Sequence, residues 1–220
     1  MAQLTFKFPF KTKYYEQDFY VSSNNFSVYR LIEDWPKWPD KWVNIYGPQG
    51  CGKTHLSNIL KKKTKTILIL DAKKIDNKTI LELQKIEFLI IDNFDKNIID
   101  EKVLYSLLNH LKQLNSYIVI NSHLPIKDMK FQLADLSSRA NSFVDLGIKL
   151  PTDDLLRVII SKYFSDKQID ISPKISEYII KNIDRSYEKV FKFIKEIDDL
   201  SLSSGKSINI NLIKKVLIDE

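Results

Sequence analysis

The chain has 220 residues, of which 44% are hydrophobic and 28% are charged. This length can bury a large core, and the composition is that of a globular protein with one large domain and a small appendage. Only five glycines argue against a loop-rich all-β fold. The single cysteine excludes an internal disulfide, charges interrupt the N-terminus too early for a signal peptide, and no apolar run approaches membrane-spanning length. We therefore expect a cytoplasmic protein without a membrane partner.

The basic excess is confined to the first two thirds of the chain. The net charge is +6 and the isoelectric point is near 9.1. Residues 152–220 hold 12 basic and 12 acidic residues, so the whole excess lies in residues 1–151. Much of it is the lysine run at residues 61–65, at the end of an expected helix, where cations favourably meet the helix dipole. The charge therefore predicts at most weak DNA binding.

The first forty residues contain one ambiguous segment and one helix. Residues 3–8 alternate apolar and polar side chains, which by pattern alone favours an edge strand over an extended peptide offered to another protein. Residues 24–34 have apolar residues at helical spacing, and Ser22 or Ser23 could cap that helix. The proline-containing run at residues 35–39 ends it.

Strand and helix patterns then alternate up to residue 151. The apolar runs are continuous, which is typical of strands buried on both faces of a parallel sheet. We expect strands at residues 42–46, 66–71, 88–92, 117–120 and 142–148, and helices at residues 55–63, 77–84, 98–114 and within 130–139. This alternation predicts an α/β domain, residues 11–151, with a five-stranded parallel sheet.

Beyond Pro151 the strand signal disappears. Four helical patterns follow one another, several of them after a Thr, Ser or Asn that can cap a helix. They lie at residues 153–165, 172–182, 187–202 and 209–217. Residues 152–220 are therefore predicted to form a small all-helical domain.

Residues 47–54 read GPQGCGKT and fit the phosphate-loop pattern. The glycines let backbone N–H groups face phosphate oxygens, Lys53 reaches the outer phosphates, and the Thr54 hydroxyl ligates Mg²⁺. A short apolar run precedes the loop and a helix follows it, whose N-terminus adds positive potential. This context predicts a site for ADP or ATP with Mg²⁺.

Asp92 ends an apolar strand well after the phosphate loop. Alone it would be interpreted as a turn cap, but beside Lys53 and Thr54 it is better interpreted as the carboxylate that orients Mg²⁺. Asn93 follows it, where many ATPases carry a carboxylate that activates water. Because an amide cannot accept that proton, we expect nucleotide binding with slow intrinsic hydrolysis.

Arginine is rare in this lysine-rich chain, with four arginines against thirty lysines. Arg139 and Arg185 would each be a surface residue by composition, but a retained arginine indicates a geometric need such as contact with phosphate. His55, after the phosphate loop, is expected to pack or to form a hydrogen bond, as Cys51 is expected simply to fit the loop. His110 and His123 show no metal-binding spacing.

Together these residues resemble AAA+ ATPases of the DnaA group over nearly the whole chain. The segments that carry the resemblance are residues 18–21, 24–25, 47–56, 90–93, 119–122, 136–139 and 184–185. The resemblance implies an AAA+ core followed by a helical lid, an arginine finger at Arg139, a sensor 1 position at Asn121 and a sensor 2 position at Arg185. It further implies a nucleotide site formed by Val21, Gly47, Gly50, Cys51, Gly52, Lys53, Thr54, His55, Asp92, Asn121 and Arg185.

Within that group the chain is similar to the regulatory inactivators of DnaA, the Hda subgroup. Residues 3–8 (QLTFKF) resemble the peptide by which that subgroup docks on the sliding clamp, although Phe stands where Leu is common. This reverses the preference for an edge strand and implies a clamp-binding segment at residues 1–10, with contacts from Gln3, Leu4, Phe6 and Phe8. DnaA has a C-terminal DNA-binding domain, and the chain ends at Glu220, so we expect no origin-box recognition.

The resemblance implies a cooperative mechanism. A chain bound to the DNA polymerase III sliding clamp (beta subunit) would press Arg139 against ATP held by DnaA and promote its hydrolysis, which limits re-initiation of replication. Its own nucleotide, expected to be ADP, would set the angle between core and lid through Lys53 and Arg185, and a homodimer or higher oligomer is expected. The alternatives are a DnaA-like adaptor or helicase loader that binds single-stranded DNA, and a generic AAA+ ATPase that acts by self-assembly. Asn93 counts against the last.

Overall fold

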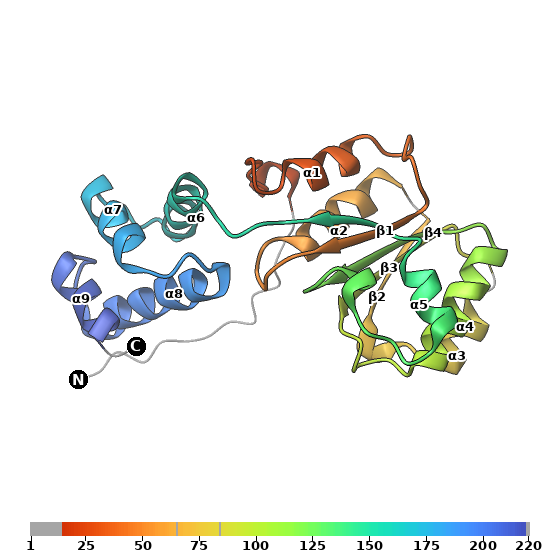
Figure 1. The fold of residues 1–220 in the computed structure, drawn as a ribbon. Helices are drawn as coiled ribbons and strands as arrows, with labels where there is room; N and C mark the ends of the chain where they lie inside the picture. Colours follow the sequence, from red (N-terminus) through yellow and green to blue (C-terminus); the bar gives the residue numbers. More distant parts are fainter. Residues whose placement is uncertain (1–14, 65, 84, 219–220) are drawn as a thin grey trace. The chain divides into compact units, whose positions relative to one another are not determined.

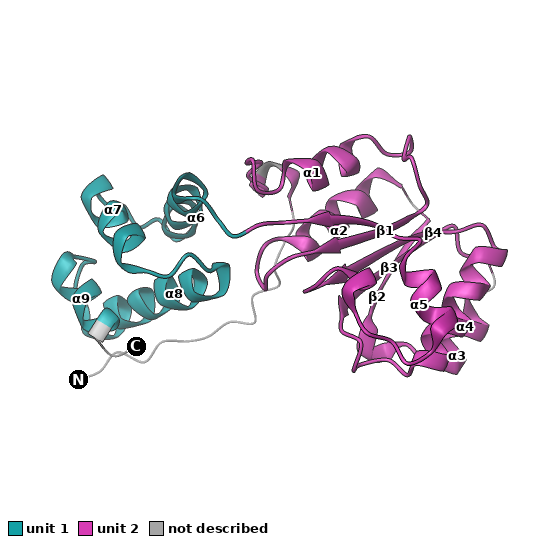
Figure 2. Ribbon diagram, viewed as in Figure 1, with its two compact units in different colours: residues 1–13, 150–220 teal, residues 14–149 magenta. Residues whose placement is uncertain are grey.

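The computed structural model describes residues 15–64, 66–83 and 85–218. The segment expected to bind the clamp, residues 3–8, lies outside this range. The described residues form two compact units, a core unit of residues 15–149 and a helical unit of residues 150–218 (Figure 2).

The core unit is built on one five-stranded sheet, as predicted (Figure 1). All strand pairs are parallel, in the spatial order β2-β3-β4-β1-β5. The strands are β1 (Trp42–Tyr46), β2 (Ile67–Asp71), β3 (Phe88–Phe94), β4 (Tyr117–Ser122) and β5 (Val144–Gly147). Strands β3 and β4 extend two residues beyond the predicted ends because Phe94, which is buried, still pairs with Ser122 after an irregularity at the strand end.

Helices cover both faces of the sheet, α1 and α2 on one side and α3 to α5 on the other (Figure 1). They are α1 (Phe26–Glu33), α2 (Lys53–Lys63), α3 (Asn77–Glu82), α4 (Glu101–Gln113) and α5 (Ala134–Ala140). Short 3₁₀ turns are η1 (Glu16–Asp18), η2 (Ala72–Lys74) and η3 (Ile126–Asp128). Helix α4 begins three residues later than predicted because Asp100 caps it, accepting hydrogen bonds from the backbone N–H groups of Lys102 and Val103.

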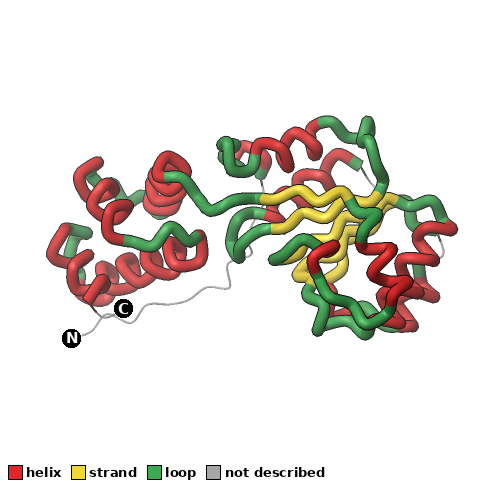
Figure 3. The backbone as a smooth tube through the Cα atoms, viewed as in Figure 1, coloured by secondary structure: helices red, strands yellow, loops and turns green. Residues whose placement is uncertain are grey.

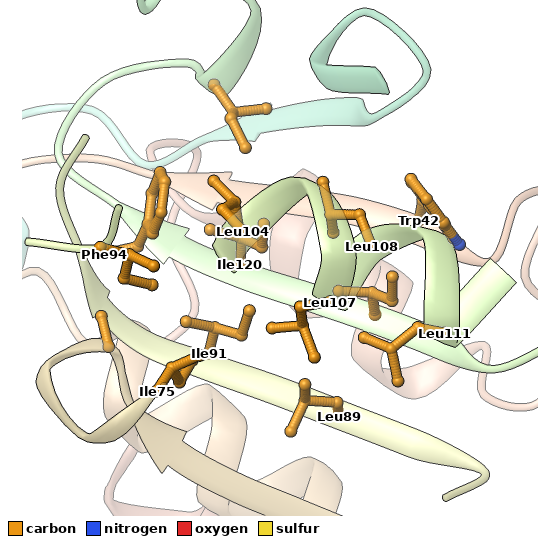
Figure 4. Close-up of a cluster of buried hydrophobic side chains, with 14 of the residues drawn as sticks. Trp42, Ile75, Leu89, Ile91, Phe94, Leu104, Leu107, Leu108, Leu111 and Ile120 are labelled. Carbon is orange, nitrogen blue, oxygen red and sulfur yellow. The ribbon is translucent and has the colours of Figure 1, made fainter. Parts of the chain in front are cut away.

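A leucine stripe on α4 joins that helix to the sheet (Figure 4). Leu104, Leu107, Leu108 and Leu111 recur at the spacing of one helix face, and each is at most 1% exposed. They belong to one buried cluster with strand residues such as Ile91. Burying each such side chain stabilises the fold by roughly 1.5–3 kcal/mol. This packing holds the ends of β3 and β4 in place beneath the candidate site.

The predicted cap of the first helix is wrong. Asn25, rather than Ser22 or Ser23, occupies the N-cap position of α1. Its side chain does not cap the helix but ties down the preceding turn, since Oδ1 accepts from the Ser22 N–H at 2.8 Å and Nδ2 donates to the Tyr20 carbonyl at 3.0 Å. Asn25 is 3% exposed, and burial of its amide requires both partners.

The helical unit contains the four helices predicted after Pro151 (Figure 3). They are α6 (Asp153–Asp166), α7 (Pro173–Asn182), α8 (Tyr187–Ser204) and α9 (Ile210–Ile218). Thr152 and Ser186 cap α6 and α8 with their side-chain oxygens, and Gly205 ends α8 in the left-handed conformation. A separate apolar cluster holds these helices together. Across the described part of the chain, no helix has the length and apolar character that crossing a membrane requires.

Candidate nucleotide site

The phosphate loop connects β1 to α2 at the carboxyl edge of the sheet. Gly52 has φ of 100°, and a Cβ there would lie 2.8 Å from the Phe19 ring. A Cβ on Gly47 would lie 2.7 Å from the Ile148 carbonyl oxygen. Both positions therefore require glycine, for conformation and for space. The loop begins beside β4, where the Gly47 N–H donates to the Ser122 carbonyl at 3.2 Å.

The side chain of Lys53 folds back onto the first residues of the phosphate loop. Its Nζ donates to the carbonyl oxygens of Gly47 at 2.8 Å and Pro48 at 3.0 Å. The ammonium group also lies 3.7 Å from Cys51 Sγ. Burial raises the pKa of the Cys51 thiol, an effect that Lys53 only partly opposes. The thiol therefore stays protonated, as expected for a residue that fits the loop.

Thr54, Asp92 and Asn121 form one hydrogen-bonded network. Thr54 Oγ1 donates to Asp92 Oδ2 at 2.7 Å, and Asn121 Nδ2 donates to Asp92 Oδ1 at 3.0 Å. Asn121 Nδ2 also lies 2.8 Å from Ser57 Oγ, on the first turns of α2. Asp92 is 7% exposed and Asn121 is fully buried. Since β3 and β4 are neighbours in a parallel sheet, their polar carboxyl ends meet at this point.

The network supplies oxygen ligands that suit Mg²⁺. Thr54 Oγ1 and Asp92 Oδ2 lie together at the first turn of α2. Within residues 15–64, 66–83 and 85–218, no three His, Cys, Asp or Glu side chains gather closely enough to hold a metal ion by themselves. A bound Mg²⁺ would therefore need phosphate and water oxygens, which is the coordination that this ion prefers. Asn121 Oδ1 is buried without a hydrogen-bond partner and offers an acceptor to a bound group.

A cavity of about 740 Å³ opens over this network. Its wall contains loop residues 49–54 together with His55 and Asn121, whereas Gly47 and Asp92 do not line it. The wall also contains residues that sequence reasoning had not assigned to the site, among them Lys73, Asp95 and His123. Each of these lies one to two residues beyond the end of β2, β3 or β4. Their common signal is that position, because ligands of α/β proteins bind beyond the carboxyl ends of the strands.

Asn93 is held by a residue of the neighbouring strand. It has φ of 56°, and its Nδ2 donates to Asp71 Oδ2 at 2.8 Å. The Asn93 amide, followed by the Lys73 backbone N–H, holds the pKa of the Asp71 carboxyl below its usual value. The predicted amide next to Asp92 is thus oriented by a carboxylate that the sequence did not reveal.

The segment before α1 contacts the site through the Tyr15 carbonyl and the Phe19 ring. His55 Nε2 lies 2.7 Å from the Tyr15 carbonyl oxygen, and its ring meets the edge of Phe19 at 5.4 Å between centroids. His55 lines the cavity and also packs and forms a hydrogen bond, as expected. Val21 is half-buried and does not line the cavity, so in the described core unit Phe19 is the closer neighbour of the loop.

Arg139 lies at the opposite, amino edge of the sheet. It is in the last turn of α5, just before β5, and its Nε donates to Asn109 Oδ1 on α4 at 3.1 Å. It lines a second hollow with Lys41, the residue before β1, and Trp42, the first residue of β1. Lys41 precedes Gly47 by six residues, so the two edges are about 20 Å apart. Arg139 therefore does not reach its own phosphate loop.

Arg185 belongs to the helical unit. Its Nε and Nη2 donate to the two carboxylate oxygens of Asp153 at 2.8 and 3.1 Å. This exposed bidentate pair raises the pKa of Arg185 and lowers that of Asp153. Of the other predicted site residues, Gln3, Leu4, Phe6 and Phe8 lie outside the described residues.

The phosphate loop on this five-stranded parallel sheet defines a P-loop α/β fold, which matches the fold of a solved DnaA domain. Over most of its length the chain is similar in sequence to the replication initiator DnaA. It is 27% identical to DnaA of Helicobacter pylori over 238 residues, covering 95% of this chain and 50% of the relative. It is 25% identical to DnaA of Chlorobaculum tepidum over 196 residues, covering 80% and 40%. The chain thus spans about half the length of these DnaA proteins.

A relative of similar length exists in Haemophilus influenzae. It is an uncharacterized protein, 21% identical over 212 residues, and the match covers 91% of this chain and 92% of the relative. No protein-family model matches the chain.

Solved structures of DnaA share the fold. Domain III of the Thermotoga maritima replication initiation protein DnaA superposes with a TM-score of 0.77 at 18% identity, covering 96% of this chain and 98% of that domain. AMPPCP-bound DnaA from Aquifex aeolicus superposes with a TM-score of 0.71 at 18% identity, covering 95% of this chain and 71% of that one. The expected relation to the DnaA group is confirmed at the level of fold and homology.

Proposed function

We propose that this chain is an Hda-like negative regulator of replication initiation that acts in the cytoplasm. In this proposal it binds ADP or ATP with Mg²⁺, docks on the sliding clamp through residues 3–8 and promotes hydrolysis of ATP held by DnaA. Arg139 is the group that acts on the partner's ATP. The chain works as a dimer or higher oligomer and contributes little hydrolysis of its own.

The nucleotide part of the proposal is supported by the carboxyl edge of the sheet. The glycine cradle, Lys53 and the Thr54–Asp92 pair at 2.7 Å provide the groups that phosphate and Mg²⁺ require. Mg²⁺, when bound, would neutralise phosphate charge. A similar protein, DnaA from Aquifex aeolicus, is described as bound to AMPPCP.

The single observation that carries the proposal is the separation of two features on one sheet. Next to Asp92 the chain has Asn93, whose amide is bonded to Asp71 and cannot accept a proton. Arg139 lies at the opposite edge, and the strand rise places the two edges about 20 Å apart. A chain with an amide at this position and an arginine far from its own loop is suited to act on a nucleotide held elsewhere.

The helical unit would report which nucleotide is bound. Arg185 is paired with Asp153 through two hydrogen bonds, both of which are exposed and exchangeable. A phosphate group is a stronger partner for a guanidinium than an exposed carboxylate. We propose that a nucleotide phosphate competes with Asp153 for Arg185, the role that the resemblance implies for a sensor 2 arginine.

The test is hydrolysis of DnaA-bound ATP, measured with and without this chain and DNA-loaded clamp. We expect the chain to accelerate hydrolysis and Arg139→Ala to lose about 10³-fold of that stimulation while keeping nucleotide and clamp binding. Arg139→Lys should not restore it, because lysine lacks the planar donor pair. Full stimulation by Arg139→Ala contradicts the assignment of that residue. A clamp pull-down that survives alanine at Gln3 and Leu4 contradicts the docking segment.

A second candidate function is a DnaA-like adaptor or helicase loader that binds single-stranded DNA. It is favoured by the shared fold with a replication initiator DnaA described as bound to AMPPCP and single-stranded DNA, at a TM-score of 0.70 and 18% identity. Tight single-stranded DNA binding together with DNA-stimulated ATPase activity, and no effect on DnaA-bound ATP, would support this candidate instead.

A further inference from the structure

A basic cleft lies at the amino edge of the sheet, where the proposed function needs only Arg139. We use this name for the hollow of about 410 Å³ that is lined by three cations, Lys41, Lys112 and Arg139. They come from three different elements, the residue before β1, the last turn of α4 and the last turn of α5. Their convergence is produced by the tertiary fold.

The cleft carries net positive charge. Asp40 is the carboxylate in its wall, and its Oδ1 accepts hydrogen bonds from the backbone N–H groups of Lys41 and Trp42. Three cations therefore face one carboxylate that is already engaged with the backbone. Ser138 and Asn115 add short polar side chains to the wall. A hollow with convergent cations and small polar groups suits a compact polyanion.

Two of the cations are held in place. Arg139 Nε is bonded to Asn109, which leaves its terminal nitrogens for another partner. Lys41 Nζ donates to the Asn115 carbonyl at 3.0 Å and lies 5.0 Å from the centre of the Tyr117 ring. Lys112 is exposed at the end of α4. The cleft therefore combines two positioned cations with one that can move toward a ligand.

We propose that the basic cleft binds the phosphate tail of a nucleotide held by a separate protein subunit, with Lys41 and Lys112 sharing the charge neutralisation with Arg139. This rests on the proposed function and adds two residues to it. The chain's own nucleotide cannot supply the phosphates, since the phosphate loop lies at the other edge, about 20 Å away. Cations that converge on one hollow fit a short triphosphate, whereas a nucleic-acid backbone needs a row of charges.

The experiment compares variants in hydrolysis of DnaA-bound ATP with DNA-loaded clamp. We expect Lys112→Ala and Lys41→Ala each to lower the stimulated rate about tenfold, and the double variant to lower it further, because each removes a charged contact to phosphate. Added salt should slow the wild type more steeply than the double variant. Lys130→Ala, an exposed lysine of the same unit outside the cleft, is the matched control. Lys41→Arg should rescue activity, which separates loss of charge from loss of folding.

The possible outcomes distinguish failure of the cleft proposal from failure of the proposed function. If Arg139→Ala is inactive while Lys112→Ala and the double variant equal the wild type, the cleft proposal is wrong and the proposed function stands. If the wild type gives no stimulation, both fall. A parallel titration with fluorescent single-stranded DNA measures the DNA affinity of the wild type and the lysine variants. If the lysine variants weaken DNA binding and leave stimulated hydrolysis unchanged, the cleft is a nucleic-acid site and the proposal is overturned.

Discussion

The two edges of the same sheet are organised in opposite ways. At the carboxyl edge, Thr54 and Asn121 both donate hydrogen bonds to Asp92, so side chains of the same chain fix the position of this carboxylate. At the amino edge, Lys41 and Arg139 belong to a hollow with an excess of positive charge. The carboxyl edge therefore holds its side chains in a defined geometry for a ligand. The amino edge carries an excess of positive charge, which a bound anion would balance.

The largest effect is expected at the carboxyl edge. Lys53→Ala removes the cation that the loop positions beside Gly47 and Pro48, and we expect nucleotide affinity to fall about 100-fold, the size of a lost charge-assisted contact. Titration with a fluorescent ADP analogue measures this. Lys61→Ala, in the last turn of the same helix, is the control. Unchanged affinity in Lys53→Ala would mean that the loop does not hold phosphate.

The second prediction tests why we expect the nucleotide site at the carboxyl edge to hydrolyse ATP slowly. Exchanging the pair, Asp71→Asn with Asn93→Asp, restores one donor and one acceptor across the 2.8 Å contact and places a carboxylate beside Asp92. Asp tolerates the positive φ of this position. We expect ATP hydrolysis by the purified chain to rise about 100-fold, the lower range for a general base.

The two single variants serve as controls for the exchanged variant. Asn93→Asp alone puts two carboxylates in contact, and their repulsion disturbs the geometry, so we expect a smaller gain. Asp71→Asn alone adds no carboxylate and should give none. If the exchanged variant stays as slow as the wild type, the missing carboxylate does not limit hydrolysis.

The third prediction concerns backbone shape. Gly52→Ala should lower the unfolding free energy of the core unit by about 3 kcal/mol, since the residue has φ of 100° and its new Cβ meets Phe19 at 2.8 Å. Gly205→Ala is a matched control at φ of 63° with no atom within 4 Å of the Cβ, and should cost about 1 kcal/mol. Differential scanning calorimetry compares them. Equal losses would show that Phe19 does not press on the loop.

The smallest effect is expected for a change in stability at Asp145 on β5, which lies away from both sites. Asp145 is a carboxylate whose side chain is 5% exposed, with Lys127 Nζ at 3.2 Å, and burial raises its pKa. Because the folded-state pKa is above the unfolded one, the charged form lowers stability at neutral pH, and stability is gained as the pH falls through the folded-state pKa toward the unfolded value.

Asp145→Asn should therefore raise the unfolding free energy at pH 7 by about 0.5 kcal/mol, and the gain should shrink as the pH is lowered. Thermal unfolding of both proteins across pH 4 to 7 measures the difference, with Asp135→Asn, at an exposed position of the same unit, as control. A gain that grows at low pH would contradict the sign.

Local patterns were sufficient for the elements and for the phosphate site. Continuous apolar runs identified the five strands, and GPQGCGKT together with Asp92 identified the residues that meet at the carboxyl edge. These signals are short in range, since they depend on continuous apolar runs, on helix period and on loop glycines. The cap of α1 was missed because Ser22, Ser23 and Asn25 are all good caps by composition.

Local sequence patterns are enough to predict the parallel α/β fold, the phosphate loop and the amide of Asn93 in place of a carboxylate. Which side chains share a site depends instead on the tertiary structure. The partner of Asn93 is Asp71, 22 residues earlier, and the basic cleft joins residues near 41, 112 and 139. Both follow from the strand order β2-β3-β4-β1-β5, which places β2 beside β3 and β1 between β4 and β5. Strand order depends on packing across the whole sheet and leaves no local pattern.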